Sequence, residues 1–92
     1  MARKRDRLEI IHDILLVIRD HRGVVRPTHI LYKSNLSHPM LTEYLDELKT
    51  KGFLVESTDR EGKRSYALTE KGYNYLRDYG VIRGFVDSYG LD

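Results

Sequence analysis

Residues 27–52 read PTHILYKSNLSHPMLTEYLDELKTKG, and this stretch decides the fold. A helix is predicted to open at Pro27 or Thr28, because proline is tolerated in a first helical turn, and to end at Ser34-Asn35. After a tight turn, Ser37 can cap a longer helix through its hydroxyl group. The buried face of that helix is marked by leucines at helical spacing, Leu41, Leu45 and Leu48. A short helix, a tight turn and a longer helix together predict a helix-turn-helix.

The segment after Lys51-Gly52 has the pattern of a β-hairpin. Phe53-Leu54-Val55 is an apolar strand candidate. Residues 59–62, DREG, predict a turn in which the glycine can adopt a positive φ. Apolar side chains then alternate with small ones on a return strand, at Tyr66 and Leu68. We therefore expect two antiparallel strands directly after the helix-turn-helix.

The segment before residue 27 predicts a first helix from about Asp6 to Asp20, covered on two sides. One apolar stripe comprises Leu8, Ile11, Leu15 and Ile18, and a second comprises Ile10, Ile14 and Val17. Gly23 is expected to stop this helix. Val24-Val25-Arg26 is β-branched and precedes a proline, which favours extended backbone, so a short strand is predicted there.

A fourth helix is predicted after Thr69, whose hydroxyl can cap it, and Glu70 suits the positive end of its dipole. It runs on through Tyr73, Leu76 and Tyr79. Tyr73 and Leu76 are expected to pack against the second apolar stripe of the first helix, which comprises Ile10, Ile14 and Val17, and so to close the core. The chain therefore has an α+β, mostly helical fold class, a winged helix-turn-helix with an additional C-terminal helix. We divide it into a winged-helix domain, residues 1–79, and a helical extension, residues 80–92.

The extension carries an apolar stripe that the core does not need. Its members fall at i, i+3, i+4 and i+7 and are Ile82, Phe85, Val86 and Tyr89. An exposed stripe of this kind is typical of an interface, so the sequence predicts a homodimer joined through the fourth helix and residues 81–91. Gly80 and Gly84 weaken the helix and permit a break or a close crossing. The alternative is that the tail folds back on its own domain.

Several strings, in this order and spacing, resemble an archaeal winged-helix family of small transcription-regulator-like and chromatin-type proteins. The strings are Ile14-Leu15, residues 28–36 (THILYKSNL), residues 44–48 (YLDEL), residues 51–54 (KGFL) and residues 66–72 (YALTEKG). They span nearly the whole chain. The resemblance implies the winged-helix fold and DNA binding, and some members of the family carry a C-terminal dimerising helix. It does not imply a particular target sequence.

Double-stranded DNA is therefore the expected partner, bound through the helix-turn-helix and a basic wing. The candidate DNA-binding residues are Arg26, Thr28, His29, Lys33, Ser37, His38, Pro39, Thr42, Arg60, Lys63 and Arg64. The basic ones form clusters around the second helix and in the wing, and Arg3, Lys4, Arg5 and Arg7 add another. We expect these clusters to converge on one face, where each neutralised phosphate releases counterions.

The third helix departs from the pattern of a sequence-specific DNA-recognition helix because it carries three acidic residues, Glu43, Asp46 and Glu47. Acidic side chains repel phosphate, and the first turn offers no arginine for bidentate contact with guanine. We therefore expect weak sequence specificity or recognition of DNA shape. The acids also suit the alternative function, a winged-helix protein–protein interaction module without DNA binding.

Composition excludes several of the remaining classes of function. The 92 residues make one domain, with 40% hydrophobic and 33% charged residues and a net charge of +2. There is no cysteine, the four histidines lack the i, i+4 spacing of a helical metal site, and no catalytic motif occurs. We expect no enzyme activity, cofactor, metal or small-molecule ligand. No apolar run reaches the roughly 20 residues of a membrane span, so a cytoplasmic, nucleoid-associated protein is expected.

Overall fold

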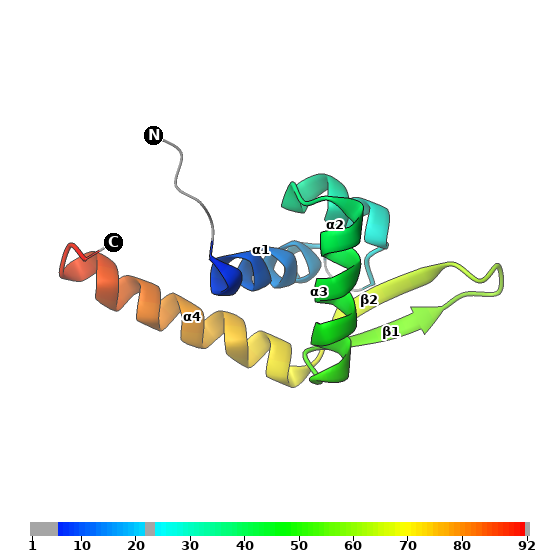
Figure 1. Cartoon of the computed structure of the whole chain (residues 1–92). Coiled ribbons are helices and arrows are strands. Elements are labelled where there is room, and N and C mark those ends of the chain that lie inside the picture. Colours follow the sequence, from blue (N-terminus) through cyan, green and yellow to red (C-terminus); the bar gives the residue numbers. More distant parts are fainter. Residues whose placement is uncertain (1–5, 22–23, 92) are drawn as a thin grey trace.

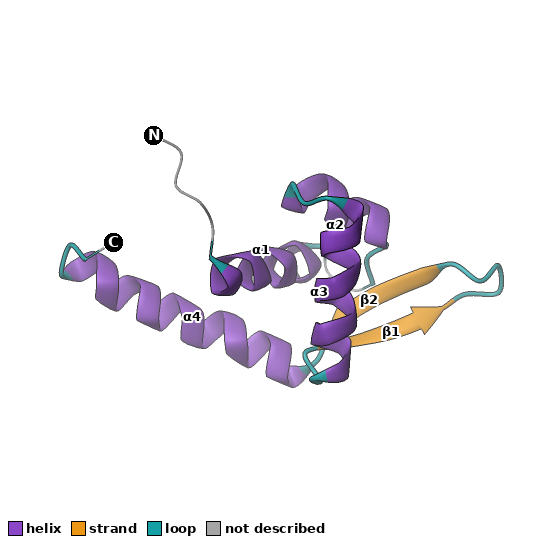
Figure 2. Cartoon of the chain, viewed as in Figure 1, coloured by secondary structure: helices purple, strands orange, loops and turns teal. Residues whose placement is uncertain are grey.

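The computed structural model describes residues 6–21 and 24–91 (Figure 1). Its elements, in chain order, are α1 (Arg7–Asp20), α2 (Pro27–Ser34), α3 (His38–Thr50), β1 (Leu54–Thr58), β2 (Arg64–Leu68) and α4 (Glu70–Ser88). Figure 2 shows the mostly helical fold, with a two-stranded hairpin that projects from the helices. The predicted fold class is confirmed. The expectations for Arg3, Lys4, Arg5 and Gly23 lie outside the described residues.

Local signals set the ends of the helices. Asp6, Ser37 and Thr69 are the N-caps of α1, α3 and α4, and each side chain accepts a hydrogen bond from a backbone N–H three residues later. Asn35 ends α2 with a φ of 58° and a ψ of 39°, a left-handed conformation that asparagine tolerates. The sequence therefore predicted these boundaries, because each depends on neighbours in the chain.

The core lies where α1, α2, α3 and the hairpin meet. Its buried members are Ile10, Ile11, Ile14, Leu15, Ile18, Val25, Ile30, Leu41, Leu45, Leu48, Leu54, Tyr66 and Leu76. The three predicted leucines of α3 are among them, so the predicted buried face of that helix is confirmed. Leu8, expected on a buried stripe of α1, is instead 57% exposed. It lies in the first turn of α1, where its side chain borders an open hollow beside α4.

Tyr73 is the second correction to the expected core. We expected it to pack against α1, but its side chain is 51% exposed. Tyr75 takes that place, because its hydroxyl donates to the carbonyl oxygen of Leu8 at 2.9 Å and its ring meets the ring of Phe53 edge-on. Two residues along a helix turn the side chain by about 200°. The sequence pattern therefore found the helix and missed the face of α4 that meets α1.

The hairpin pairs β1 with β2 in antiparallel register, with Leu54 opposite Leu68 and Glu56 opposite Tyr66. On the other side of β2, the backbones of Val25 and Tyr66 exchange two hydrogen bonds, both of 2.8 Å. This single bridge replaces the short strand predicted over residues 24–26. Pro27 begins α2 directly afterwards, so the extended segment has no room to continue.

Helix α4 runs unbroken through Gly80 and Gly84. The division between residues 79 and 80 therefore falls inside a single helix, and the tail does not fold back as a separate segment. The last turns extend away from the hairpin (Figure 1) and leave large apolar side chains exposed. These are Val81, Ile82, Phe85, Tyr89 and Leu91. Within residues 6–21 and 24–91, no helix has the length and apolarity that crossing a membrane requires.

Gly72, near the start of α4, lies where the structure leaves no room for a side chain. A Cβ atom there would lie 2.6 Å from the carbonyl oxygen of Phe53, which is fixed by a hydrogen bond from the backbone N–H of Thr69. We predict that Gly72→Ala lowers the free energy of unfolding by about 1–3 kcal/mol, as overpacking does. Urea denaturation checks this value.

Gly80→Ala is the matched control for Gly72→Ala, because nothing lies within 4 Å of a Cβ at position 80 in the same helix. Alanine there should raise the free energy of unfolding by up to ~1 kcal/mol through its helix propensity. A result in which both variants are stabilised would show that the start of α4 does not press against Phe53.

Candidate nucleic-acid interface

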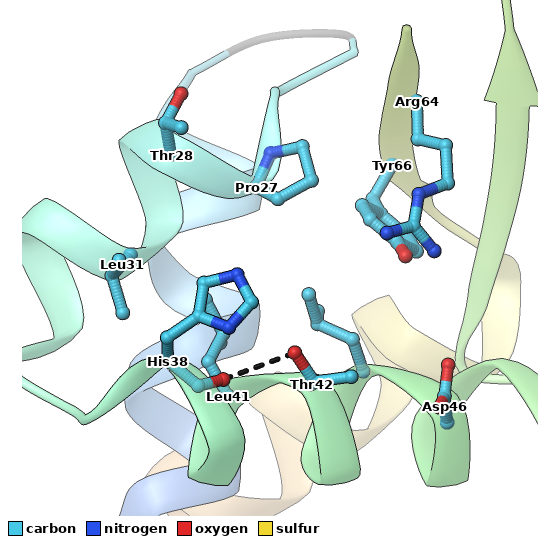
Figure 3. Close-up of a pocket in the computed structure, with 10 residues that line it drawn as sticks. Pro27, Thr28, Leu31, His38, Leu41, Thr42, Asp46, Arg64 and Tyr66 are labelled. Atoms are coloured by element: carbon cyan, nitrogen blue, oxygen red, sulfur yellow. Dashed lines mark hydrogen bonds between the residues drawn. The ribbon is translucent and has the colours of Figure 1, made fainter. Parts of the chain in front are cut away.

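The beginning of α3 and the adjoining elements form one hollow of about 50 Å³. Figure 3 shows Thr28 on α2, His38 and Thr42 on α3, and Arg64 on β2 around it. The hydroxyl of Thr42 already donates a hydrogen bond to the carbonyl oxygen of His38 at 3.0 Å, so only its acceptor capacity is left for a ligand. The remaining lining residues are Pro27, Leu31, Leu41, Leu45, Asp46 and Tyr66. Four predicted DNA-binding side chains, which are up to 36 positions apart in the sequence, thus surround one hollow with a mainly apolar lining.

A second, wider groove lies between the start of α2 and the wing. It has a volume of about 340 Å³ and is lined by Arg26, Pro27, Thr28, Lys63 and Arg64. Four of these five are predicted DNA-binding residues. The hairpin therefore places its basic side chains beside the basic start of α2. Of the remaining candidates, Arg60 is exposed in the wing turn, and Ser37 and Pro39 are at the start of α3.

His29 and Lys33 do not join this groove. They line a different hollow with residues of α1, on another side of α2 from Thr28. Arg7 is also separate, because it pairs with Glu47 of α3 and lines a hollow with Met40 and Glu43. The structure therefore brings together Arg26 and the wing residues, and it does not bring together all the basic clusters that we expected on one face.

The acidic side chains of α3 differ in their surroundings. Glu47 accepts hydrogen bonds from Lys51, at 2.9 Å, and from Arg7. These two cations hold the pKa of Glu47 below its usual value, Lys51 contributing most. Among the described residues, Glu43 and Asp46 form no ion pair. Only these two acids therefore present an uncompensated charge on α3.

Glu56, which the sequence analysis did not single out, anchors the base of the wing. Its carboxylate accepts a hydrogen bond from the Tyr66 hydroxyl at 3.0 Å and pairs with Lys49 at 3.3 Å and Arg64 at 3.6 Å. The bond from Tyr66, followed by that from Lys49, lowers the pKa of Glu56. Burial, helped by Glu56, raises the pKa of Tyr66 to about 12. Arg64 is thereby held at the edge of the groove.

Asp59 fixes the other end of the wing. Its carboxylate accepts the backbone N–H groups of Glu61 and Lys63, at 2.9 and 3.0 Å, and pairs with Arg26 at 3.2 Å. Gly62 completes the turn with a φ of 80°. An aspartate that opens a turn and caps its own backbone is a recognisable sequence signal. The ion pair of Asp59 with Arg26, which lies 33 positions earlier, could not be recognised from the sequence.

A helix-turn-helix followed by a two-stranded wing defines the winged-helix class. The pattern of the winged helix-turn-helix family matches residues 4–85 of this chain. The chain therefore belongs to the winged helix-turn-helix family.

Comparisons with individual proteins agree with this assignment. An uncharacterized protein of Methanocaldococcus jannaschii is 32% identical over 69 residues, which are 75% of this chain and 64% of that protein. The crystal structure of Sso10a-2, a DNA-binding protein from Sulfolobus solfataricus, superposes with a TM-score of 0.76 and 26% identity over 94% of this chain and 90% of its own. The resemblance to an archaeal winged-helix family is confirmed.

A third comparison concerns the fold alone. A mutant of MepR from Staphylococcus aureus, solved with a bound oligodeoxyribonucleotide, has a TM-score of 0.75 and 14% identity. The match covers 89% of this chain and 62% of MepR. This chain therefore spans less than two thirds of that regulator and of the M. jannaschii protein.

The Asp59 carboxylate generates a pH prediction. Its pKa lies below the ordinary 3.8, first because of the Lys63 backbone N–H and then because of the Arg26 guanidinium. A lowered pKa in the folded state stabilises the fold above the unfolded pKa, and this contribution is lost as the pH falls through the lowered value. We expect a carboxyl NMR titration of Asp59 with a midpoint below 3.8.

The Arg26→Gln variant separates the two causes. Its Asp59 midpoint should rise but remain below 3.8, because the bond from the Lys63 backbone is kept. The Lys63 amide resonance should follow the same midpoint in both proteins. An ordinary midpoint in the unsubstituted protein would contradict the turn geometry.

Proposed function

We propose that this chain binds duplex DNA as a transcriptional regulator, with the start of α3 at the major groove and the cationic groove on the phosphate backbone. The observation that carries the proposal is that Arg26, Thr28, Lys63 and Arg64 line one open groove. Winged-helix folds place the third helix against DNA with basic elements beside it. The relative Sso10a-2, described as a DNA-binding protein, supports the same function. The proposal makes the chain a cytoplasmic, nucleoid-associated protein.

The charge on α3 determines the mode of binding. Glu43 and Asp46 have no cationic partner within the described ranges, so they repel phosphate at close approach. Direct reading of bases then depends on the small and polar side chains of the first turn, His38, Pro39 and Thr42. Most of the binding free energy should come from backbone contacts of the groove, which are strongly salt-dependent and carry little sequence information.

The alternative, a protein-interaction module, is favoured by the same two acids. An uncompensated acidic face on the third helix suits a basic protein partner. The two functions differ in one measurable respect, because only the DNA-binding function requires the groove cations. The experiment on the wing below therefore distinguishes them.

We also propose that the chain acts as a homodimer through the end of α4. Ile82, Phe85 and Tyr89 are 63%, 60% and 67% exposed on one helix, and Val86 is half-buried. An apolar stripe of this density is costly in water and favours an interface. Ile82 and Val86 also border a hollow with Leu8 of α1, so the exposed Leu8 belongs to the same surface. A two-fold dimer would present two α3 helices to one duplex and add avidity.

The wing prediction concerns Lys63→Ala, Arg64→Ala. The double variant should bind random duplex DNA more weakly, and the slope of log affinity against log salt should fall by up to about two units, one for each lost phosphate contact. Fluorescence anisotropy at several salt concentrations measures both quantities. Arg77→Ala is the control, because Arg77 pairs with Asp78 on α4, outside the groove.

Two results would overturn the DNA-binding proposal. One is an unchanged affinity and salt slope in the double variant, which would remove the wing from the interface. The other is the absence of any binding by the unsubstituted chain at low salt, which would leave the protein-interaction module as the function.

The dimer prediction concerns Phe85→Asp, Val86→Asp. Light scattering at tens of micromolar should give the intact chain twice its 10.8 kDa mass and the variant a single mass. Tyr73→Asp is the matched control, because Tyr73 is a comparably exposed aromatic side chain on the same helix but on the face opposite to Ile82 and Val86. A monomeric intact chain, or equal dissociation by the control, would contradict the proposed interface.

A further inference from the structure

Two imidazole rings meet at the junction of α1 and α2. His21 is the C-cap of α1 and His29 lies in the first half of α2. Their ring centroids are 4.4 Å apart, with the planes inclined by 52°. The two positions are eight residues apart in the sequence, and no metal-binding spacing relates them. The pair therefore exists only because the chain turns between the two helices.

The rings border a hollow of about 310 Å³ that is lined by Val17, Asp20, His21, His29 and Lys33. His21 is exposed and His29 is half-buried. Within the described part of the chain, no hydrogen bond joins a ring nitrogen of His21 or of His29 to another group. The ring nitrogens are thus accessible to a ligand from solvent. The carboxylate of Asp20 lines the same hollow and pairs with Arg19 at 3.1 Å.

The separation of the rings matches a particular coordination geometry. With metal–nitrogen bonds of about 2.0–2.1 Å, two imidazoles bound at a right angle to one ion have centroids about 4.4–4.5 Å apart, and a tetrahedral angle requires about 5.1 Å. The observed 4.4 Å fits the right angle. Tetragonal sites of nitrogen and oxygen ligands are typical of Ni²⁺ and Cu²⁺.

We propose that His21 and His29 form an open binding site for a divalent transition metal of this kind, Ni²⁺ or Cu²⁺. Among the residues that the structure describes, no group of three or more metal-ligating side chains occurs. The ion would therefore be held by the two imidazoles alone and would keep water in its other positions. Such a site exchanges its metal readily. It is independent of the proposed DNA binding, because neither ring borders the cationic groove.

The site has two consequences for the molecule. A bound ion joins the end of α1 to α2, so it should stabilise the folded state in proportion to its occupancy. Lys33, in the same hollow, repels the ion, so the charge of Lys33 limits the affinity. Because coordination requires neutral imidazole, binding should weaken on acidification.

Isothermal titration of the untagged full chain with NiCl₂ tests the proposal. We expect one Ni²⁺ per chain, with binding weakened more than about tenfold in His21→Gln and in His29→Gln, since even the loss of an outer-shell group costs about 10–100-fold. Lys33→Gln should bind Ni²⁺ more tightly, because the substitution removes a positive charge from the hollow. His12→Gln is the matched control, because His12 stacks on Tyr79 away from this hollow and should leave the affinity unchanged.

Three outcomes would overturn the site. They are no Ni²⁺ binding by the intact chain at millimolar concentration, unchanged affinity in both His21→Gln and His29→Gln, and an equal loss in His12→Gln, which would indicate unspecific binding to surface histidines. Circular dichroism of the metal-free variants verifies that each one is folded, so a loss of affinity reports on the ligands themselves.

Discussion

The packing of the whole fold centres on the buried side chain of Tyr66. Its side chain is 2% exposed, and its backbone holds Val25, the residue that leads into α2, by two hydrogen bonds. A buried hydroxyl without a partner costs about 1–3 kcal/mol, so the bond from the Tyr66 hydroxyl to Glu56 is required. Glu56 in turn holds Lys49 of α3 and Arg64 of β2. One buried ring thereby links the hairpin to both helices of the helix-turn-helix.

The arrangement of charge follows from these links. The net charge of +2 is too small to describe the surface, because the acids are distributed unevenly among their partners. Glu47 is paired on the side of α3 that faces Arg7 and Lys51. Asp59 and Glu56 instead fix the cations that border the groove. Arg26 and Arg64 are therefore oriented before any ligand arrives, which reduces the conformational entropy that binding must remove.

The N-terminal turns of α4 pack against the rest of the domain, and its C-terminal turns extend beyond it (Figure 1). Its first turns are fixed by the Thr69 cap and by the close approach of Gly72 to Phe53. Tyr75 and Tyr79 then stack along α1, and Tyr79 also covers His12. Beyond Tyr79, among the described residues, α4 meets only the first turn of α1, where Ile82 and Val86 border an open hollow with Leu8. The apolar stripe that follows is exposed for this geometric reason.

The sequence by itself determined the elements, their order and their ends. Ser37, Thr69, Asn35 and Gly62 act on backbone groups within a few positions of themselves, so local reading predicted them correctly. The leucines of α3 were equally readable, because the helical period places them on one side whatever lies opposite. The position of Arg60, Lys63 and Arg64 at the turn of the wing was readable as well, since they flank that turn in the sequence.

Only the tertiary structure decided how the helices are rotated against one another. The helical period fixes the angles between side chains on one helix, but not the rotation of that helix relative to its neighbour. Tyr75 rather than Tyr73 therefore meets α1, and His29 lies beside His21 while Thr28 joins the wing. The pairing of Arg26 with Asp59 depends in the same way on the packing of a hairpin against a helix, which no interval in the sequence records.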